Sequence, residues 1–230
     1  MRQKADLIRA RLKAPRAAAI AGILFSVLLI AGLLLFRLSV RADPLEAGAW
    51  LRTSANTTAL GLNLIPFAGI AFLWSLPCCA TAWESLRIAF FATVFLGSGL
   101  LFLAMLFASA ATGGGIIIAY TAKHEGLLGS PTFTFARAVT YEIMNLYAVK
   151  MASVFMISTS TLAIRTGFFA RIAFLGYALA LFLLLSGRYI EWILMLFPLW
   201  VLLISIYILI DNLRRPSEVG ATSPESNSLR

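Results

Sequence analysis

Six stretches of the chain are apolar for long enough to cross a lipid bilayer as helices, and this pattern restricts the fold more than any other feature. The hydrocarbon core of a bilayer is about 30 Å thick and needs roughly 20 apolar helical residues. The predicted spans cover residues 17–36, 60–77, 89–111, 143–164, 168–186 and 191–210. Because backbone polar groups in lipid must be bonded within the protein, the sequence predicts an all-α, polytopic transmembrane helix bundle.

The composition excludes an ordinary soluble enzyme. Of the 230 residues, 60% are hydrophobic and only 13% are charged, whereas soluble domains carry about 25% charged residues. Six spans of about 20 residues each account for most of the apolar side chains. We therefore expect a single membrane domain over residues 17–211.

Lys and Arg are distributed unevenly between the two predicted faces of the membrane. The first 16 residues contain six of the 19 Lys and Arg residues and only one acidic residue, Asp6. With six spans, the even-numbered loops and the C-terminus share that side and add six more: Arg87, Arg165, Arg171, Arg214, Arg215 and Arg230. This face therefore holds 6 + 6 = 12 of the 19 basic residues. The positive-inside rule makes it cytoplasmic, which predicts an N-in/C-in protein.

The two ends of the chain differ from the spans in composition. Residues 1–16 are predicted to be a basic cytoplasmic segment that can contact anionic lipid headgroups. Residues 212–230 are rich in Ser, Glu, Gly and Pro, which predicts a disordered cytoplasmic tail. A cleavable signal peptide is disfavoured, because its apolar region would run for about 7–15 residues and end at a small-residue site, whereas this run stops at Arg37.

A charged residue inside the fourth predicted span is the strongest functional indication in the sequence. Lys150 lies about 6 Å inside the predicted outer boundary, at 1.5 Å per helical residue. Tyr141, Glu142 and Asn145 precede it by one turn or more. This candidate intramembrane polar site has two interpretations. The four residues could bind a polar ligand. Alternatively, they pair with one another and stabilise the bundle, while the Lys150 side chain extends to the membrane interface. Structural pairing is favoured.

Other residues inside the spans are compatible with both packing and transport. Pro66 and Pro198 are predicted to kink their helices, and broken helices line the sites of many transporters. The hydroxyl run Ser158–Thr161 can bond to its own backbone or line a polar pore. Small residues at four-residue spacing, among them Gly22 and Gly176, predict close packing within the bundle, with homodimerisation as the alternative.

Catalytic patterns are largely missing from the sequence. The only histidine is His124, so a zinc site of the usual kind is not expected. Gly113–Gly115 follow a helix rather than a strand, which excludes a phosphate-binding loop and predicts the start of an outer loop that runs to about Thr140. No aromatic or motif pattern supports nucleic-acid binding. We therefore expect a non-enzymatic protein without cofactor or metal.

Two functional classes follow from these observations. In the first, the protein acts through lipids or through protein partners, which include another copy of the chain or another membrane protein. In the second, it is a small transporter or channel with a polar site around Lys150, Glu142 and the Ser158–Thr161 run.

Four segments of the chain carry a family resemblance, namely Asn63–Trp74, Phe90–Phe102, Val154–Thr161 and Phe197–Ile210. Together they resemble a family of bacterial multi-span membrane proteins of unknown function. The resemblance covers nearly the whole chain and implies a multi-pass location in the bacterial cytoplasmic (inner) membrane. It implies no activity and no site residues.

One segment departs from that family. Where the family has a charged cytoplasmic loop, Ser75–Ala89 reads S-L-P-C-C-A-T-A-W-E-S-L-R-I-A. Back-translated with permissible codons and shifted by one base, the segment becomes F-I-A-V-L-R-D-R-L-G-E-S-E-D-R. We therefore hypothesise that a one-base loss and a one-base gain put this segment out of frame. Resequencing tests the hypothesis, which would mean that Cys78 and Cys79 were never selected for chemistry.

Overall fold

The computed structural model describes residues 2–39, 49–85, 89–123, 125–165, 170–186 and 192–214, with some side chains near helix ends left undescribed. All regular structure in these ranges is helical, which confirms the all-α prediction. The elements are α1 (Arg2–Ser39), α2 (Ala49–Thr53), α3 (Ala55–Ser85), α4 (Ala89–Lys123), α5 (Glu125–Leu128), α6 (Pro131–Glu142), the π-helix η2 (Ile143–Ala148), α7 (Val149–Arg165), α8 (Ala170–Leu185), the 3-10 turn η3 (Ile193–Met195) and α9 (Leu196–Arg214).

The helices are suited to a membrane. Four stretches in the described part of the chain are long and apolar enough to cross a bilayer: Arg16–Ser39, Ala55–Leu76, Phe91–Ala122 and Ile193–Ile210. The remaining predicted spans, 143–164 and 168–186, fall mainly on η2 with α7 and on the shorter helix α8. Long apolar helices are thus confirmed for four of the six predicted segments.

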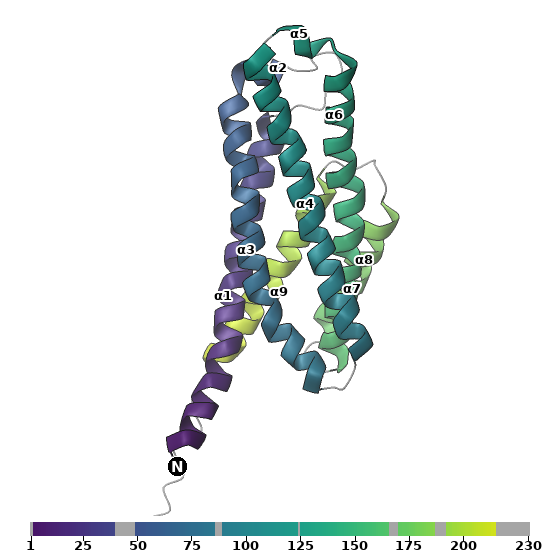
Figure 1. Cartoon of the computed structure of the whole chain (residues 1–230). Helices are drawn as coiled ribbons and strands as arrows, with labels where there is room; N and C mark the ends of the chain where they lie inside the picture. The colour runs from purple at the N-terminus through teal and green to yellow at the C-terminus, as the bar shows by residue number, and fades with distance from the viewer. Residues whose placement is uncertain are drawn as a thin grey trace, which may run out of the picture.

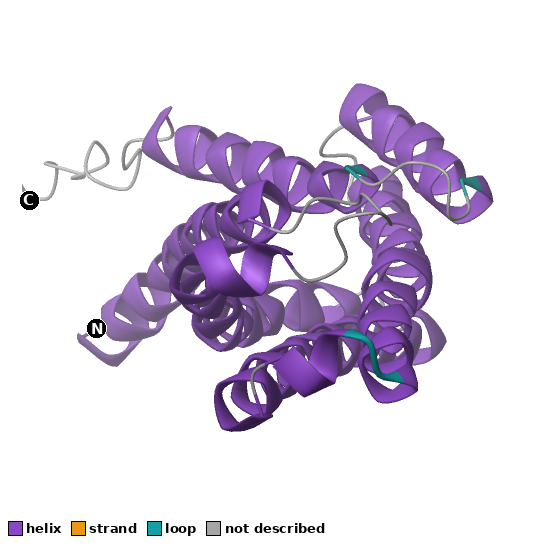
Figure 2. Ribbon diagram, turned by 90° about the horizontal axis from the view of Figure 1, so that it is seen from above, coloured by secondary structure: helices purple, strands orange, loops and turns teal. Residues whose placement is uncertain are grey.

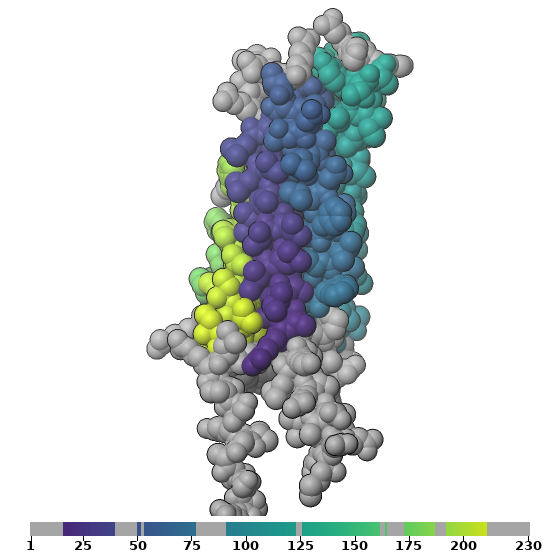
Figure 3. Space-filling model, turned by 90° about the vertical axis from the view of Figure 1, so that its left-hand side faces the viewer, coloured from purple at the N-terminus to yellow at the C-terminus, as the bar shows by residue number. Residues whose placement is uncertain are grey.

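The helices form a tall bundle rather than layers (Figures 1 and 2). α1 packs along α3 and α9, α4 lies between α3 and the α6–α7 segment, and α8 packs on α7. Figure 3 shows α9, α1 and α3 side by side on one face. α1 begins and α9 ends at the same end of the bundle, here called the basal end, and α5 lies at the opposite, apical end (Figure 1).

The prediction of an outer loop from Gly113 to about Thr140 is wrong, because most of this segment is helical. α4 continues through the three glycines to Lys123, and α6 begins at Pro131. The sequence contained a start signal for α6. The Ser130 hydroxyl accepts a hydrogen bond from the backbone N–H of Phe133 at 3.2 Å, and Pro131 occupies the first turn, a common arrangement at helix N-termini.

Contacts between α4 and α6 explain why helical structure continues beyond the predicted span. The Ser109 hydroxyl donates to the carbonyl oxygen of Thr140 at 2.9 Å, and the Thr140 hydroxyl lies 3.0 Å from that of Thr112. A Cβ atom on Gly113 would lie 3.3 Å from the Leu62 side chain. Tertiary packing therefore overrides the low intrinsic helix propensity of the glycines.

Both ends of the domain differ slightly from the predicted boundaries. The backbone of the basic N-terminal segment is helical from Arg2 and continuous with α1, and α9 extends to Arg214 instead of ending near residue 211. Residues 215–230, the rest of the predicted tail, lie outside the described residues. α3 continues to Ser85, but the side chains of Cys78 and Cys79 also lie outside them.

Six phenylalanines from five helices meet at the centre of the bundle. Their contacting ring centroids are 4.5–6.3 Å apart, a range typical of favourable aromatic pairs. All six are buried. This phenylalanine cluster consists of Phe25 of α1, Phe72 of α3, Phe95 and Phe102 of α4, Phe155 of α7 and Phe197 of α9. It joins α1, α3, α4, α7 and α9 into one core.

Close backbone contacts through glycine bring the helices together around this cluster. A Cβ atom on Gly61 of α3 would lie 2.9 Å from the carbonyl oxygen of Gly32 on α1, and a Cβ atom on Gly32 would lie 3.0 Å from that of Gly61. The predicted small-residue faces are also used within the chain. Gly22 lies against Ser205 of α9, and Gly176 of α8 lies against Ser160 and Trp200.

Replacement of Gly61 by Ala should lower the thermal stability of the purified protein in detergent. The new methyl group would push α3 away from α1, which we expect to cost about 1–3 kcal/mol, as overpacking generally does. Gly114→Ala is the matched control, because a Cβ atom there meets nothing within 4 Å and helix propensity favours alanine. Equal stability of the two variants would contradict the close contact between α1 and α3.

Candidate functional site

Two of the predicted polar residues, Tyr141 and Asn145, gather around Arg37 of α1. The Arg37 side chain is only 8% exposed, and its Nη2 donates a hydrogen bond to Oδ1 of Asn145. Its guanidinium carbon lies 5.7 Å from the centre of the Tyr141 ring, within the range of a cation–π contact. A buried cation needs such partners, because desolvation without them is costly.

A second arginine approaches the same ring. The guanidinium carbon of Arg137 lies 5.8 Å from the Tyr141 ring centre, and the Phe36 ring lies 6.2 Å from it. Two cations therefore converge on one aromatic side chain. We refer to Arg37, Arg137, Tyr141 and Asn145 as the Arg37 cluster.

The Arg37 cluster lies at one boundary of the apolar part of the bundle. Arg37 follows Arg16 by 37 − 16 = 21 residues on α1, and Asn145 precedes Arg165 by 165 − 145 = 20 residues. At 1.5 Å per residue, both separations are about 30 Å, the thickness of a hydrocarbon core. The cluster therefore marks the apical boundary if Arg16 and Arg165 mark the basal one.

A π-helix shapes the backbone at this point. Glu142 is half-buried and directly precedes η2, and Asn145 lies within η2. A π-turn fits an extra residue into a helical turn and is often found at functional sites. It changes which residues share a face of the α6–α7 segment. Neither η2 nor the pairing of Arg37 was predicted from the sequence, in which Arg37 marks only the end of the first span.

Lys150 contacts a different element. Its Nζ donates a hydrogen bond at 3.2 Å to the carbonyl oxygen of Leu184, in the last turn of α8. A lysine in this position satisfies an unpaired helix carbonyl and interacts favourably with the negative end of the helix dipole. The structure therefore brings Tyr141 and Asn145 together around Arg37 and places Lys150 against the end of α8.

The hydroxyl run bonds mainly to its own helix. Ser158, Thr159 and Thr161 each donate to the carbonyl oxygen four residues earlier, at 3.0, 2.5 and 2.8 Å. Thr161 also lies 2.6 Å from the hydroxyl of Tyr177 on α8. Ser160 is buried, and its hydroxyl has no hydrogen-bond partner among the described residues. These contacts match the backbone-bonding interpretation of the run.

The two prolines occupy different environments. α3 remains one helix across Pro66, whose side chain is exposed. Pro198 is buried in the first turn of α9, directly after the 3-10 turn η3. A missing N–H costs little there, because the first N–H groups of an α-helix have no partner within it. The change in helix type near Pro198 therefore falls at the beginning of α9.

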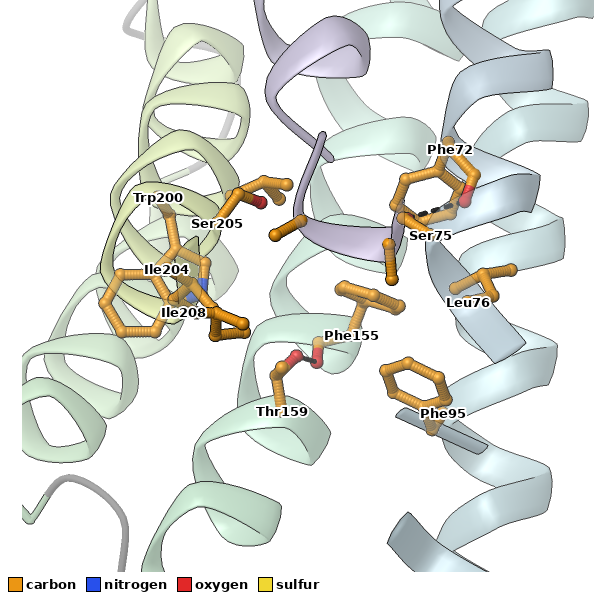
Figure 4. A pocket seen from close by; sticks show the side chains of 13 residues that line it. Phe72, Ser75, Leu76, Phe95, Phe155, Thr159, Trp200, Ile204, Ser205 and Ile208 are labelled. Atoms are coloured by element: carbon orange, nitrogen blue, oxygen red, sulfur yellow. Dashed lines mark hydrogen bonds between the residues drawn. The ribbon is translucent and has the colours of Figure 1, made fainter. Parts of the chain in front are cut away.

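A pocket lies among α1, α3, α4, α7 and α9, on the basal side of the bundle (Figure 4). Its cavity volume is about 60 Å³, and the space around it is partly open to solvent. Its walls are mainly apolar and include Phe72, Phe95, Phe155 and Trp200. This basal pocket could not be predicted from the sequence, because its walls come from five helices far apart in the chain.

Polar atoms in the basal pocket are few. The Ser75 hydroxyl donates to the carbonyl oxygen of Phe72 at 2.7 Å, and that of Thr159 donates to its own helix. The indole N–H of Trp200 is buried and has no hydrogen-bond partner among the described residues. Trp200 therefore offers the pocket a hydrogen-bond donor.

No group of three His, Cys, Asp or Glu side chains suited to a metal ion occurs in the part of the chain that the structure describes. Comparison with protein-family models, with curated proteins and with solved structures finds no match to this chain. The bacterial family resemblance therefore stays a prediction.

Replacement of Asn145 by Leu should destabilise the protein, because it removes an acceptor from a buried guanidinium. We expect a loss of about 2–3 kcal/mol in the free energy of unfolding, measured by denaturation in detergent. Asn63→Leu, at an exposed asparagine on α3, should have little effect. Adding Arg37→Met to Asn145→Leu should restore most of the loss, since the buried charge that lost its Asn145 acceptor is then gone. If the losses in unfolding free energy caused by the two substitutions simply added, the coupling between Arg37 and Asn145 would be contradicted.

Proposed function

We propose that this chain is a six-span protein of the bacterial cytoplasmic membrane that acts through lipid or protein partners and catalyses no reaction. In this proposal both termini are cytoplasmic, so the basal end of the bundle faces the cytoplasm. The basic segment 1–16 then lies beside the anionic lipid headgroups of that leaflet. The uneven distribution of Lys and Arg and the common basal position of the two helix ends support this orientation.

The phenylalanine cluster is the observation that carries the proposal. It fills the centre of the bundle between the Arg37 cluster and the basal pocket, and four of its members, Phe25, Phe95, Phe102 and Phe197, have no exposed surface. A permanent polar pathway would have to pass through these rings. The buried Arg37 and the half-buried Lys150 both make contacts that hold helices together, Arg37 with Asn145 and Lys150 with the end of α8.

Homo-oligomerisation receives less support than partners of another kind. The small residues that would suit a dimer interface, Gly22 and Gly176, lie against other helices of the same chain. The outward-facing side chains of α9 are apolar over Leu199, Leu203 and Ile206, as expected for a lipid-facing surface.

A small transporter or channel remains the second candidate. The basal pocket favours it, because a cavity on one side of the phenylalanine cluster and polar residues on the other could be connected by a rearrangement of the rings. In that case Lys150 and Glu142 would act on the substrate, and the Ser158–Thr161 run would line part of its path.

Flux measurements distinguish the two candidates. Vesicles that contain the purified protein should show no proton or potassium flux above that of protein-free vesicles, measured with pH- and potential-sensitive dyes. Lys150→Met should lower the stability by about 1 kcal/mol through loss of the bond to the end of α8, and the Lys150→Met, Glu142→Leu double variant should leave flux unchanged. A protein-dependent flux that these variants abolish without loss of stability would contradict the proposal and support transport.

The orientation can be tested by cysteine labelling in a chain with Cys78 and Cys79 replaced by serine. A cysteine at Gly129, exposed in the apical turn before α6, should react with a membrane-impermeant maleimide in intact bacterial cells with a permeabilised outer envelope. A cysteine at Ser217 in the C-terminal tail should react only after the cytoplasmic membrane is opened. The reverse pattern, or equal labelling of both positions in intact cells, would refute the six-span N-in/C-in arrangement.

A further inference from the structure

We propose that the basal pocket receives the carbonyl oxygen of one membrane-dissolved molecule, whose apolar body extends from the pocket into the surrounding lipid. The ester region of a phospholipid and the ring of an isoprenoid quinone both have this chemistry. The site rests on the proposed membrane arrangement, and no residue of the Arg37 cluster takes part in it.

The unpartnered donor defines the polar requirement of the ligand. Trp200 is 3% exposed, and its indole nitrogen has no hydrogen-bond partner among the described residues. Figure 4 places this nitrogen on the side of the ring that faces the pocket. A buried N–H without an acceptor costs free energy, so a ligand that supplies an acceptor is favoured. The hydroxyls of Ser75 and Thr159 already donate to their own helices.

The remaining walls define the apolar requirement. The side chains of Phe72, Phe95 and Phe155 line the pocket together with small residues such as Ala18. Aromatic and aliphatic walls with few polar groups, here Trp200 and three hydroxyl residues that include Ser205, are typical of sites for largely apolar ligands, which gain affinity by burying their surface. A charged or strongly polar ligand would leave its own groups unsatisfied there.

The position of the pocket along the helices matches a ligand dissolved in one leaflet. Thr159 precedes Arg165 by six residues and Ala18 follows Arg16 by two, which puts these wall residues about 9 Å and 3 Å from the basal boundary. Half of a hydrocarbon core is about 15 Å thick. These two walls of the pocket therefore lie within the basal leaflet.

An opening toward lipid is consistent with the path of α9. This helix packs along α1 and makes few contacts with α7, and it runs obliquely across the bundle, away from α7 and α8 toward the basal end (Figure 1). A membrane-dissolved molecule can enter between helices that diverge in this way without passing through water.

Tryptophan fluorescence in reconstituted bilayers tests the proposal with the full chain. One variant retains only Trp200, with the other four tryptophans replaced by Phe, and a reference variant retains only Trp192, which is 46% exposed. Phospholipid brominated on its acyl chains forms the first arm, and a water-insoluble quinone added to unbrominated phospholipid forms the second. We expect Trp200 emission to be quenched in at least one arm, which identifies the source of the carbonyl.

Variants that fill the pocket distinguish quenching by a molecule bound in the pocket from quenching by the surrounding lipid. Ala18→Leu puts three more carbon atoms into the pocket, and Ala17→Leu, at the exposed neighbour outside it, is the matched control. Quenching should be lost in Ala18→Leu and kept in Ala17→Leu. Thr159→Leu enlarges a side chain on the α7 wall of the pocket and should have the same effect if Ala18→Leu does not fold.

The donor role of Trp200 has its own readout. Trp200→Phe keeps an aromatic wall but removes the N–H, and it should weaken binding of the quenching molecule about 3- to 10-fold, as loss of one hydrogen bond predicts. Binding is followed here by native mass spectrometry. Unchanged binding in Trp200→Phe would refute the assigned donor.

Failure of the site and failure of the membrane arrangement give different results. If brominated phospholipid quenches Trp192 but neither arm quenches Trp200, or if pocket-filling variants are quenched like the control, the proposed site is wrong. If brominated phospholipid does not quench Trp192, the membrane arrangement itself is wrong.

Discussion

Contact among six phenylalanine rings is the interaction on which the rest of this bundle depends. Phe25 and Phe197 are separated by 197 − 25 = 172 residues, yet their ring centroids lie 6.0 Å apart. Lipid chains are as apolar as these side chains, so a membrane bundle gains its stability from close packing rather than from escape from water. Large rings supply many contacts, and the Gly32–Gly61 crossing lets the backbones approach closely enough to form them.

The helical part of the fold could largely be predicted from the length of the apolar runs, because a bilayer allows few structures other than helices. The prediction was wrong beyond the apical ends of the spans. The helical continuation of α4 past Gly113 depends on bonds to Thr140 of α6, and such tertiary contacts override local glycine content. The Ser130-Pro131 helix start was visible in the sequence and would have located α6.

The candidate site could be predicted only in part. Tyr141 and Asn145 stood out as polar residues near a span, but their partner Arg37 lies more than a hundred residues away. In the sequence, Arg37 is fully explained as the basic residue that ends the first span, so nothing pointed to this contact. Lys150 is close to Tyr141 and Asn145 in sequence but bonds to α8 instead, because the direction of its side chain depends on packing and on the π-helix η2, neither of which follows from a local sequence pattern. The basal pocket depends on five helices and has no local pattern.

Whether water can reach the centre of the bundle distinguishes a protein that acts through partners from one that transports solutes. Ala152 of α7 is fully buried, three residues before Phe155, and Ala152→Cys changes little in size. In a chain without Cys78 and Cys79, reconstituted in bilayers, a closed centre predicts no reaction of this cysteine with a small water-soluble thiol reagent from either side. Reaction from either side in the folded protein would show water at the centre and contradict it.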